Sequence, residues 1–192
     1  MKRSPLAAAL VTLALLAFAA PALAAESYKV DPVHSSAIFR IKHANVSFFS
    51  GRFNDPGGSF TLDDADPTKS SFNIVLAADK VDTANDQRNA HLKSPDFFNA
   101  KQYPTIEFKS TSVKKAEGNV LHVTGNLTMH GVTKSITVPV ELTGKGVFPA
   151  GVQRAGVEAT FVVKRSDFGM SKMLEALSDD VKVVVGLSGT KQ

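Results

Sequence analysis

Five histidines are the side chains of this 192-residue chain best suited to bind a metal or to move a proton. They are His34, His43, His91, His122 and His130, and their spacing fits neither a structural zinc site nor the H-E-x-x-H pattern of zinc hydrolases. The chain has no cysteine, and no serine lies in a G-x-S-x-G motif. We therefore predict no metal site, no cofactor and no catalytic residue, and we expect that the protein is not an enzyme.

A second group of titratable side chains lies in the segment 82–93 and consists of Asp82, Arg88, His91 and Lys93. Thr83 or Asn85 can cap a short helix here, because each offers a side-chain oxygen to a free backbone N–H. One interpretation is a polar rim that faces the headgroup of a ligand. The other is helix-surface charge that pins this segment to the rest of the fold, with Arg88 holding Asp82 or Asp86. The residues alone leave both open.

An aromatic pair, Phe97 and Phe98, follows directly after this group. Ser94 with Pro95 reads as the cap and first turn of a second helix. Strand-like alternation resumes after Pro104. A polar group, two aromatic rings and the start of a strand in one segment predict a lid at the mouth of a β-structure.

The rest of the chain alternates between apolar and polar residues with a period of two. Strands are expected in 27–30, 35–43, 46–62, 72–78, 104–113, 119–129, 132–143, 155–164 and 180–188, with a short helix in 167–178. Eight to nine strands joined mostly by short turns indicate an all-β protein with an antiparallel sheet that closes on itself. Such a barrel has an interior wide enough for side chains or for one slender ligand.

The inward positions of these strands, together with the lid pair, form the expected apolar lumen. It comprises Phe39, Ile41, Phe72, Ile74, Phe97, Phe98, Ile106, Phe108, Leu127, Val138, Val140 and Phe161. Such a lining makes either a solid core or a long apolar tube, and strand parity does not separate the two. We predict a continuous apolar cavity between the strands.

The first 24 residues have the pattern of a cleaved export signal. Lys2 and Arg3 precede an apolar run, residues 6–20, and the small-x-small sequence Ala22-Leu23-Ala24 follows it. The run is shorter than the ~20 residues of a membrane-spanning helix. We expect residues 25–192 to remain as one domain, and loss of the two basic residues lowers the net charge from +4 to +2. The remaining charges are scattered, which argues against nucleic acid as a partner.

Eight segments, in this order, carry a resemblance to a known family. They are 31–35 (DPVHS), 39–43 (FRIKH), 51–53 (GRF), 81–83 (VDT), 88–98 (RNAHLKSPDFF), 103–110 (YPTIEFKS), 125–134 (GNLTMHGVTK) and 165–169 (RSDFG). On these segments the chain resembles the YceI-like family of exported lipid-binding proteins. The sequence 178–180 (SDD) departs from the glycine–acid turn that is more usual before the last strand.

The resemblance implies a lipocalin-like, extended antiparallel β-barrel of about eight strands, with short helices that cap its mouth. It also implies a periplasmic carrier that holds the tail of an isoprenoid lipid, either a polyprenyl diphosphate or an isoprenoid quinone, without catalysis. Two alternatives stay open: a hydrolase or isomerase that acts on an amphiphile in the same cavity, and a stress-related interaction protein with a solid barrel. Transient contact with a membrane or membrane protein, a homodimer, and the ligand's chain length and headgroup also stay open.

Overall fold

The computed structural model describes residues 25–192, so the expected signal peptide lies outside the described residues. The described chain contains these strands: β1 (Glu26–Val30), β2 (Ser36–His43), β3 (Ser47–Phe53), β4 (Gly57–Leu62), β5 (Ser71–Ala77), β6 (Val81–Asp82), β7 (Thr105–Lys115), β8 (Val120–Met129), β9 (Val132–Val147), β10 (Gln153–Lys164) and β11 (Asp180–Lys191). Its α-helix is α1 (Asp86–Lys93), and its 3-10 helices are η1 (Pro32–His34), η2 (Pro67–Lys69), η3 (Ala78–Lys80) and η4 (Arg165–Phe168).

Eight of the strands close into a ring in the order β1-β4-β5-β7-β8-β9-β10-β11, because β11 pairs back onto β1. All these pairings are antiparallel, and the closing register sets Tyr28 opposite Lys191 and Val30 opposite Gly189. The short turns that the sequence predicts account for this order, since consecutive strands joined by a tight turn pair with each other. The expected closed antiparallel barrel of about eight strands is confirmed.

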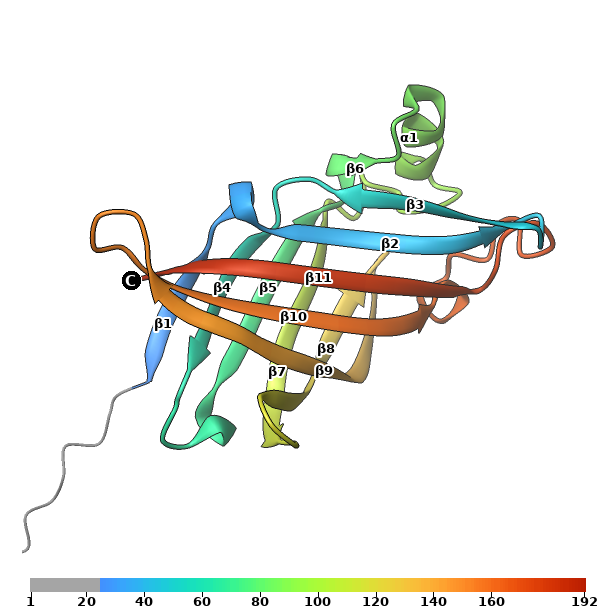
Figure 1. The fold of residues 1–192 in the computed structure, drawn as a ribbon. Helices are drawn as coiled ribbons and strands as arrows, with labels where there is room; N and C mark the ends of the chain where they lie inside the picture. The colour runs from blue at the N-terminus through green and yellow to red at the C-terminus, as the bar shows by residue number, and fades with distance from the viewer. Residues whose placement is uncertain (1–24) are drawn as a thin grey trace, which may run out of the picture.

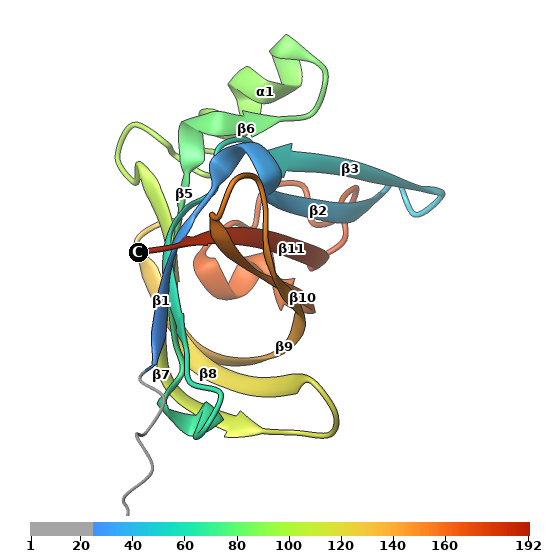
Figure 2. The ribbon, with the colours of Figure 1, turned by 60° about the vertical axis from the view of Figure 1, so that its left-hand side comes forward.

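The last strand also carries an extension outside the ring (Figures 1 and 2). The C-terminal part of β11 closes the barrel, whereas its N-terminal part pairs with β2 from Lys182–Arg40 to Gly186–Ser36. β3 pairs with β2, and the two-residue β6 adds to the end of β3. α1 follows β6 directly, and Figure 1 shows it standing beside β3. This extension places a hairpin and a helix at one end of the barrel.

The two further helices expected from the sequence are not formed. Asn85 caps α1 by accepting a hydrogen bond from Arg88 N, but Ser94 ends that helix, and its N–H bonds to His91 O. Residues 165–178 form only the 3-10 helix η4 and irregular turns. Gly169 ends η4 with a φ of 77°, a conformation that favours glycine. Four carbonyl groups of the segment, those of Met170, Lys172, Leu177 and Ser178, accept hydrogen bonds from the Arg165 side chain.

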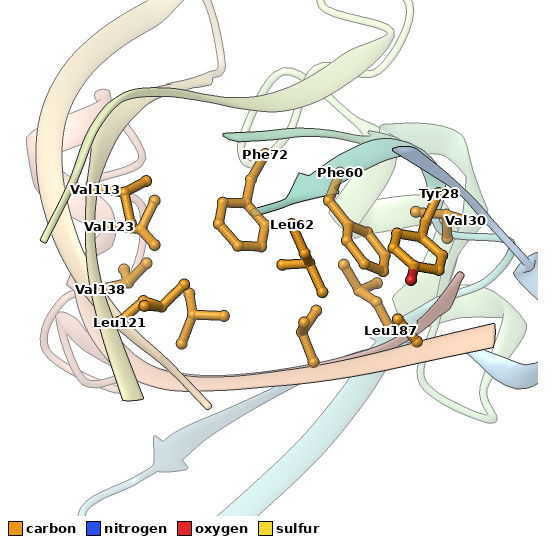
Figure 3. Packing of buried hydrophobic residues seen from close by; sticks show 13 residues of the cluster. Tyr28, Val30, Phe60, Leu62, Phe72, Val113, Leu121, Val123, Val138 and Leu187 are labelled. Carbon is orange, nitrogen blue, oxygen red and sulfur yellow. The ribbon is translucent and has the colours of Figure 1, made fainter. Parts of the chain in front are cut away.

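The apolar interior divides into two clusters. The first, shown in Figure 3, fills the end of the barrel near β1 and β4, where the Tyr28 and Phe60 rings stack at 5.3 Å and Phe72 lies 6.1 Å from Phe60. The second cluster joins the ring to the β2–β3 hairpin through residues such as Phe53 and Met129. Close packing of the Tyr28, Phe60 and Phe72 rings, typical of protein cores, therefore stabilises the part of the barrel near β1 and β4.

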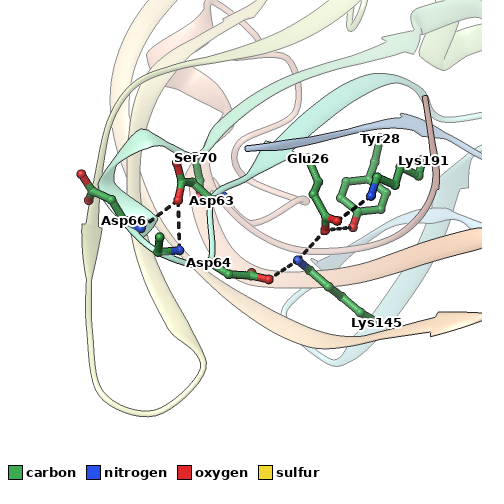
Figure 4. Close-up of polar contacts among 9 residues, drawn as sticks. Glu26, Tyr28, Asp63, Asp64, Asp66, Ser70, Lys145 and Lys191 are labelled. Carbon is green, nitrogen blue, oxygen red and sulfur yellow. Dashed lines mark hydrogen bonds and ion pairs between the residues drawn. The ribbon is translucent and has the colours of Figure 1, made fainter. Parts of the chain in front are cut away.

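Charged side chains tie the β1 end together (Figure 4). Glu26 accepts hydrogen bonds from Tyr28 Oη at 2.7 Å, from Lys145 Nζ at 2.8 Å and from Lys191 Nζ at 2.6 Å. Lys145 also donates to Asp64 at 2.6 Å. These bonds lower the pKa of Glu26 from 4.5 to about 2, and burial together with the Glu26 contact raises the pKa of Tyr28 to about 12. The network links β1, β9, β11 and the turn after β4.

We expect this network to make the barrel sensitive to acid. The folded state lowers the pKa of Glu26, so its contribution is complete above pH 4.5 and is lost as the pH falls towards 2. Denaturant unfolding between pH 7 and pH 2 should show a free energy of unfolding that declines in this window, and Glu26→Gln should decline less steeply. Glu117, which makes no ion pair within residues 25–192, provides the control. A Glu117→Gln profile identical to that of Glu26→Gln would contradict the prediction.

Candidate ligand-binding cavity

A cavity of about 350 Å³ lies between the barrel ring and the β2–β3 extension. Its wall is mainly apolar and consists of Phe39, Ile41, His43, Ser47, Phe48, Phe49, Phe53, Arg88, Leu92, Phe97, Phe98, Met129, Val163, Arg165, Met170, Leu177, Val181 and Val183. We call it the outer cavity. Its volume lies in the range of about 300–1,000 Å³ that is typical of small-molecule sites.

Alternation along β2 and β3 supplies one wall of the outer cavity. Phe39 and Ile41 point inward, and His43 continues the same parity to the end of β2. On β3, Phe49 and Phe53 flank Gly51, which is the register partner of Phe39. A Cβ at Gly51 would collide with the Phe39 ring and with Thr83 Cγ2. Glycine at this position therefore lets the Phe39 ring approach the backbone of β3 closely.

The segment from α1 to Phe98 supplies the opposite wall. Leu92 of α1 and the two rings Phe97 and Phe98 all line the outer cavity. Phe98 meets Phe53 edge-on at 5.2 Å, and its N–H donates to Leu92 O at 2.9 Å. The structure thus places the predicted aromatic pair on the cavity wall, although a turn and not a second helix carries it.

Arg88 is the one member of the predicted polar rim that lines the cavity. Its guanidinium lies 4.0 Å from the centre of the Phe49 ring, and it donates from Nε to Thr83 Oγ1 at 2.9 Å and from Nη2 to Thr83 O at 2.7 Å. The expectation that it holds Asp82 or Asp86 is wrong, because its partners are Thr83 and an aromatic face. Arg88 nevertheless remains exposed at the edge of the cavity.

The other three predicted rim residues lie outside the cavity wall. Asp82 faces Arg52 at 3.6 Å and accepts from the backbone N–H of Ala84, which is the main cause that lowers the pKa of Asp82. His91 Nε2 lies 2.9 Å from Asp96 Oδ2. Lys93 does not line the cavity. Asp82 and His91 therefore hold the lid segment in place, and the exposed polar groups that join Arg88 in the cavity wall are His43 and Ser47.

A second, inner cavity of about 80 Å³ lies deeper in the ring. Seven of the predicted lumen residues line it: Phe72, Ile74, Phe108, Leu127, Val138, Val140 and Phe161. Ile106 lines neither cavity and is buried in the second cluster. Phe39 and Ile41 line the outer one. The structure therefore has two cavities where the sequence analysis expects one.

The two cavities lie in series along the strands. On β8, β10 and β11, consecutive inward residues switch from one cavity to the other, with Leu127, Phe161 and Val185 on the inner wall. Their outer neighbours are Met129, Val163 and Val183. One layer of side chains therefore separates the two spaces.

Known proteins resemble this chain in both sequence and fold. The model of the YceI-like domain matches residues 28–188, which include every residue that lines the two cavities and all of the ring except the outer ends of β1 and β11. The chain belongs to the YceI-like family. A relative named Protein YceI, from Salmonella newport, is 39% identical over 183 residues, which cover 94% of this chain and 95% of that protein.

Solved structures resemble this YceI-like chain over most of its length. BcnA from Burkholderia cenocepacia has a TM-score of 0.76 at 26% identity and covers 83% of this chain and 98% of its own. The YceI protein of Campylobacter jejuni has a TM-score of 0.71 at 29% identity, with coverage of 79% and 90%. A polyisoprenoid binding domain from Saccharophagus degradans has a TM-score of 0.68, with coverage of 86% and 98%. At 17% identity, this last likeness concerns the fold alone.

Several wall residues of this YceI-like chain are absent from the predicted lumen. Met129, Val163, Val181 and Val183 lie on the apolar faces that strand alternation predicts, and Phe49 and Phe53 follow the same alternation on β3. His43 likewise follows the alternation, at the end of β2. Met170, Arg165 and Leu177 come from the irregular segment 165–178, which has no periodicity to read.

Arg165 has an unusual place in this wall, since it is only 4% exposed. It donates to four backbone carbonyl groups at 2.7–3.0 Å, those of Met170, Lys172, Leu177 and Ser178. Burial lowers the pKa of Arg165, while Asp179 nearby favours the charged form. The side chain thus holds the irregular segment against the outer cavity.

Two further observations concern metal binding and membrane-spanning helices within residues 25–192. No three His, Cys, Asp or Glu side chains come close enough there to hold a metal ion. Among the same residues, no helix is both long enough and apolar enough to cross a bilayer. His130, one of the candidate ligands, instead lies 2.9 Å from Phe168 O and packs against Tyr103.

Proposed function

We propose that this protein binds the apolar tail of an isoprenoid amphiphile in the outer cavity and carries it without chemical change. The observation that supports the proposal is the cavity wall itself. Phenylalanine and aliphatic side chains make up most of it, and its exposed polar groups, His43, Ser47 and Arg88, stand at the surface. An amphiphile fits such a wall with its tail inside and its headgroup outside.

Burial of the tail supplies the binding energy. Each methylene removed from water contributes about 0.8 kcal/mol, before the cost of lost translation and of ordering the tail. A tail of several isoprene units exceeds that cost. A headgroup that stays near Arg88 keeps its water, so a polar group need not be buried without partners.

The ligand class rests on the family and on the fold. A domain of the same fold, from Saccharophagus degradans, is described as polyisoprenoid binding. For the present chain we propose a polyprenyl diphosphate or an isoprenoid quinone as the ligand. We also propose export to the periplasm, supported by the basic, apolar and small-residue pattern of residues 2–24. Of the alternatives, a hydrolase or isomerase would use the same cavity, and the outer cavity argues against a solid barrel.

Mass spectrometry of lipid extracted from the purified protein tests this proposal. We expect an intact isoprenoid lipid in near-stoichiometric amount. A hydrolysed or isomerised product would favour the enzyme, provided that Asp82→Ala or His91→Ala abolishes it. Absence of lipid, together with no binding of added farnesyl diphosphate or farnesyl quinone, would overturn the proposal.

Replacing Arg88 by alanine should separate the two headgroups. A diphosphate gains charge-assisted hydrogen bonds from a guanidinium, whereas the carbonyl groups of a quinone gain less. We therefore expect Arg88→Ala to weaken farnesyl diphosphate by about tenfold, and a quinone with the same tail by no more than about twofold, in parallel titrations. Arg88 also holds Thr83 O, so unfolding is measured alongside. Equal losses for both ligands would mean that Arg88 acts only on the fold.

A further inference from the structure

Exposed apolar side chains gather at the end of the molecule where the outer cavity reaches the surface. Val46 is 82% exposed and Phe48 is 60% exposed on the β2–β3 hairpin, and Leu174 is 42% exposed on the segment before β11. The two segments are neighbours, because Ala44 N donates to Ala176 O and Ser178 N donates to Lys42 O. Figure 1 shows both at one end, opposite the β9–β10 hairpin.

Three cationic side chains lie on the outer face of β2 and β11, next to these apolar residues. Arg40 of β2 and Lys182 of β11 are register partners, so two like charges stand directly opposite each other. Lys42 follows Arg40 on the same face of β2. In the described chain none of these three forms an ion pair, although Arg40 lies 4.0 Å from the centre of the Phe48 ring. Like charges at opposed positions destabilise a sheet, so this arrangement calls for an anionic partner.

The acidic side chains near this surface do not form ion pairs with these three cations. Asp180 is bound to Lys164 at 2.8 Å, and Asp179 accepts two hydrogen bonds from Ser166. Glu175, beside Leu174, is exposed. We define the mouth surface as Arg40, Lys42, Val46, Phe48, Leu174 and Lys182. It combines insertable apolar side chains with unpaired cations around the edge of a cavity.

We propose that the mouth surface docks on an anionic lipid bilayer. Exposed apolar side chains enter the headgroup region of a bilayer, and nearby lysines and arginines bind its negative surface. The cavity edge, with His43, Ser47 and Phe48, then faces the membrane. The use of this contact rests on the proposed function: an apolar tail passes between bilayer and cavity without crossing water. Docking itself requires no bound tail.

The opposite end of the molecule offers a comparison. Val147 and Phe148 on the β9–β10 hairpin are 64% and 75% exposed, so this end is also apolar. Its cation Arg154, however, is paired with Asp31 at 2.7 Å. Neither cavity reaches Val147 or Phe148. Exposure alone therefore does not mark a docking site, and the two hairpins provide matched variants.

Sedimentation with vesicles tests the proposal. Residues 25–192 contain every strand of the closed ring and are used so that the apolar run 6–20 does not bind lipid itself. We expect binding to vesicles of phosphatidylglycerol and phosphatidylcholine, weakened by salt, and much weaker binding to phosphatidylcholine alone. Val46→Asp should reduce the affinity for the anionic vesicles about tenfold. Val147→Asp adds the same charge to the other hairpin and should change it less than about twofold.

A second pair of variants tests the cations. Arg40→Gln/Lys182→Gln should lose affinity for anionic vesicles about tenfold, yet unfold no more easily than the unmodified protein, because it removes a repulsive pair. Lys114→Gln/Lys115→Gln, which removes two exposed lysines of β7, should bind normally. Equal losses in the two double variants, or in Val46→Asp and Val147→Asp, would overturn the proposal.

Two other outcomes separate the possible partners and the two proposals. Vesicle binding that depends on Arg40 and Lys182 but not on Val46 would indicate a charged surface without insertion, as for an acidic protein, and would contradict membrane docking. Titration with farnesyl quinone in the absence of vesicles tests the cavity alone. A protein that binds the quinone but no vesicle keeps the proposed function and loses the docking surface. A protein that binds vesicles but not the quinone keeps the docking surface and loses the proposed function.

Discussion

Replacing Arg165 by methionine should lower the free energy of unfolding by about 3–5 kcal/mol, the cost of leaving buried polar groups without their charged partner. Methionine matches much of the side-chain length but donates no hydrogen bond. Four carbonyl groups then lose their donor, that of Met170 in a buried position and those of Lys172, Leu177 and Ser178 in partly buried ones. The segment 170–178 has no helix or strand ladder of its own to replace them.

The same change should damage the cavity. Arg165, Met170 and Leu177 all line the outer cavity, so a segment that leaves its place opens the wall. We expect the affinity for farnesyl quinone to fall with the stability, and amide hydrogen exchange in 166–179 to accelerate before the rest of the barrel unfolds. Arg165→Lys should recover only a part, because an ammonium group lacks the planar fork that reaches four acceptors.

The neighbouring residue provides the control for this prediction. Lys164 is also basic and lies at the end of β10, but it is exposed and makes a single ion pair with Asp180. Surface pairs of this kind contribute about 0–1 kcal/mol. Urea unfolding of Lys164→Met should therefore stay within about 1 kcal/mol of the unmodified protein. The same small loss for Arg165→Met would show that its four hydrogen bonds do not hold the segment.

The contrast between Lys164 and Arg165 also shows where sequence reasoning ends. The ring of strands follows from periodicity, because inward positions such as Phe108, Leu127 and Phe161 repeat at every second residue of their strands. The segment 165–178 has no period, and its conformation depends on which carbonyl groups one side chain reaches. The sequence predicts a helix there, but the guanidinium of Arg165 binds carbonyl groups, such as those of Met170 and Leu177, that helical N–H groups would otherwise bind.

The lid shows the same limit on a smaller scale. The polar residues Asp82, Arg88, His91 and Lys93 are close in sequence, which suggested a common role. Asp82 lies on β6 and the other three lie on α1, where Arg88 reaches the cavity edge while His91 turns to Asp96. Strand parity likewise shows which face a residue occupies, but not how much space its ring leaves. That is why two cavities stand in place of the expected single lumen.

Replacing Phe108 by alanine should join those two cavities. Phe108 lines the inner cavity and packs against both apolar clusters, and its ring lies against the backbone of Gly125. Removing the ring of a packed phenylalanine costs about 3–5 kcal/mol of stability. In exchange, the space along the strands becomes continuous, and a tail that stops at Phe108 can extend towards Phe72.

Tail-length preference is the property to measure. Each added isoprene unit buries several methylene equivalents at about 0.8 kcal/mol each, and after ordering costs we expect a gain of about tenfold in affinity for the first unit beyond the present limit. Quinones whose tails differ by single isoprene units are titrated into the unmodified protein and into Phe108→Ala. The length at which affinity stops rising should increase by at least one unit in the variant.

Phe72→Ala provides the matched control for Phe108→Ala. Phe72 also lines the inner cavity and is buried, but it packs against the first cluster alone, away from the layer that separates the two spaces. It should lose a similar amount of stability without changing the preferred tail length. If both variants shift the preference equally, general loosening of the barrel and not the opening at Phe108 sets the length. If neither shifts it, the tail does not run along the strands towards the inner cavity.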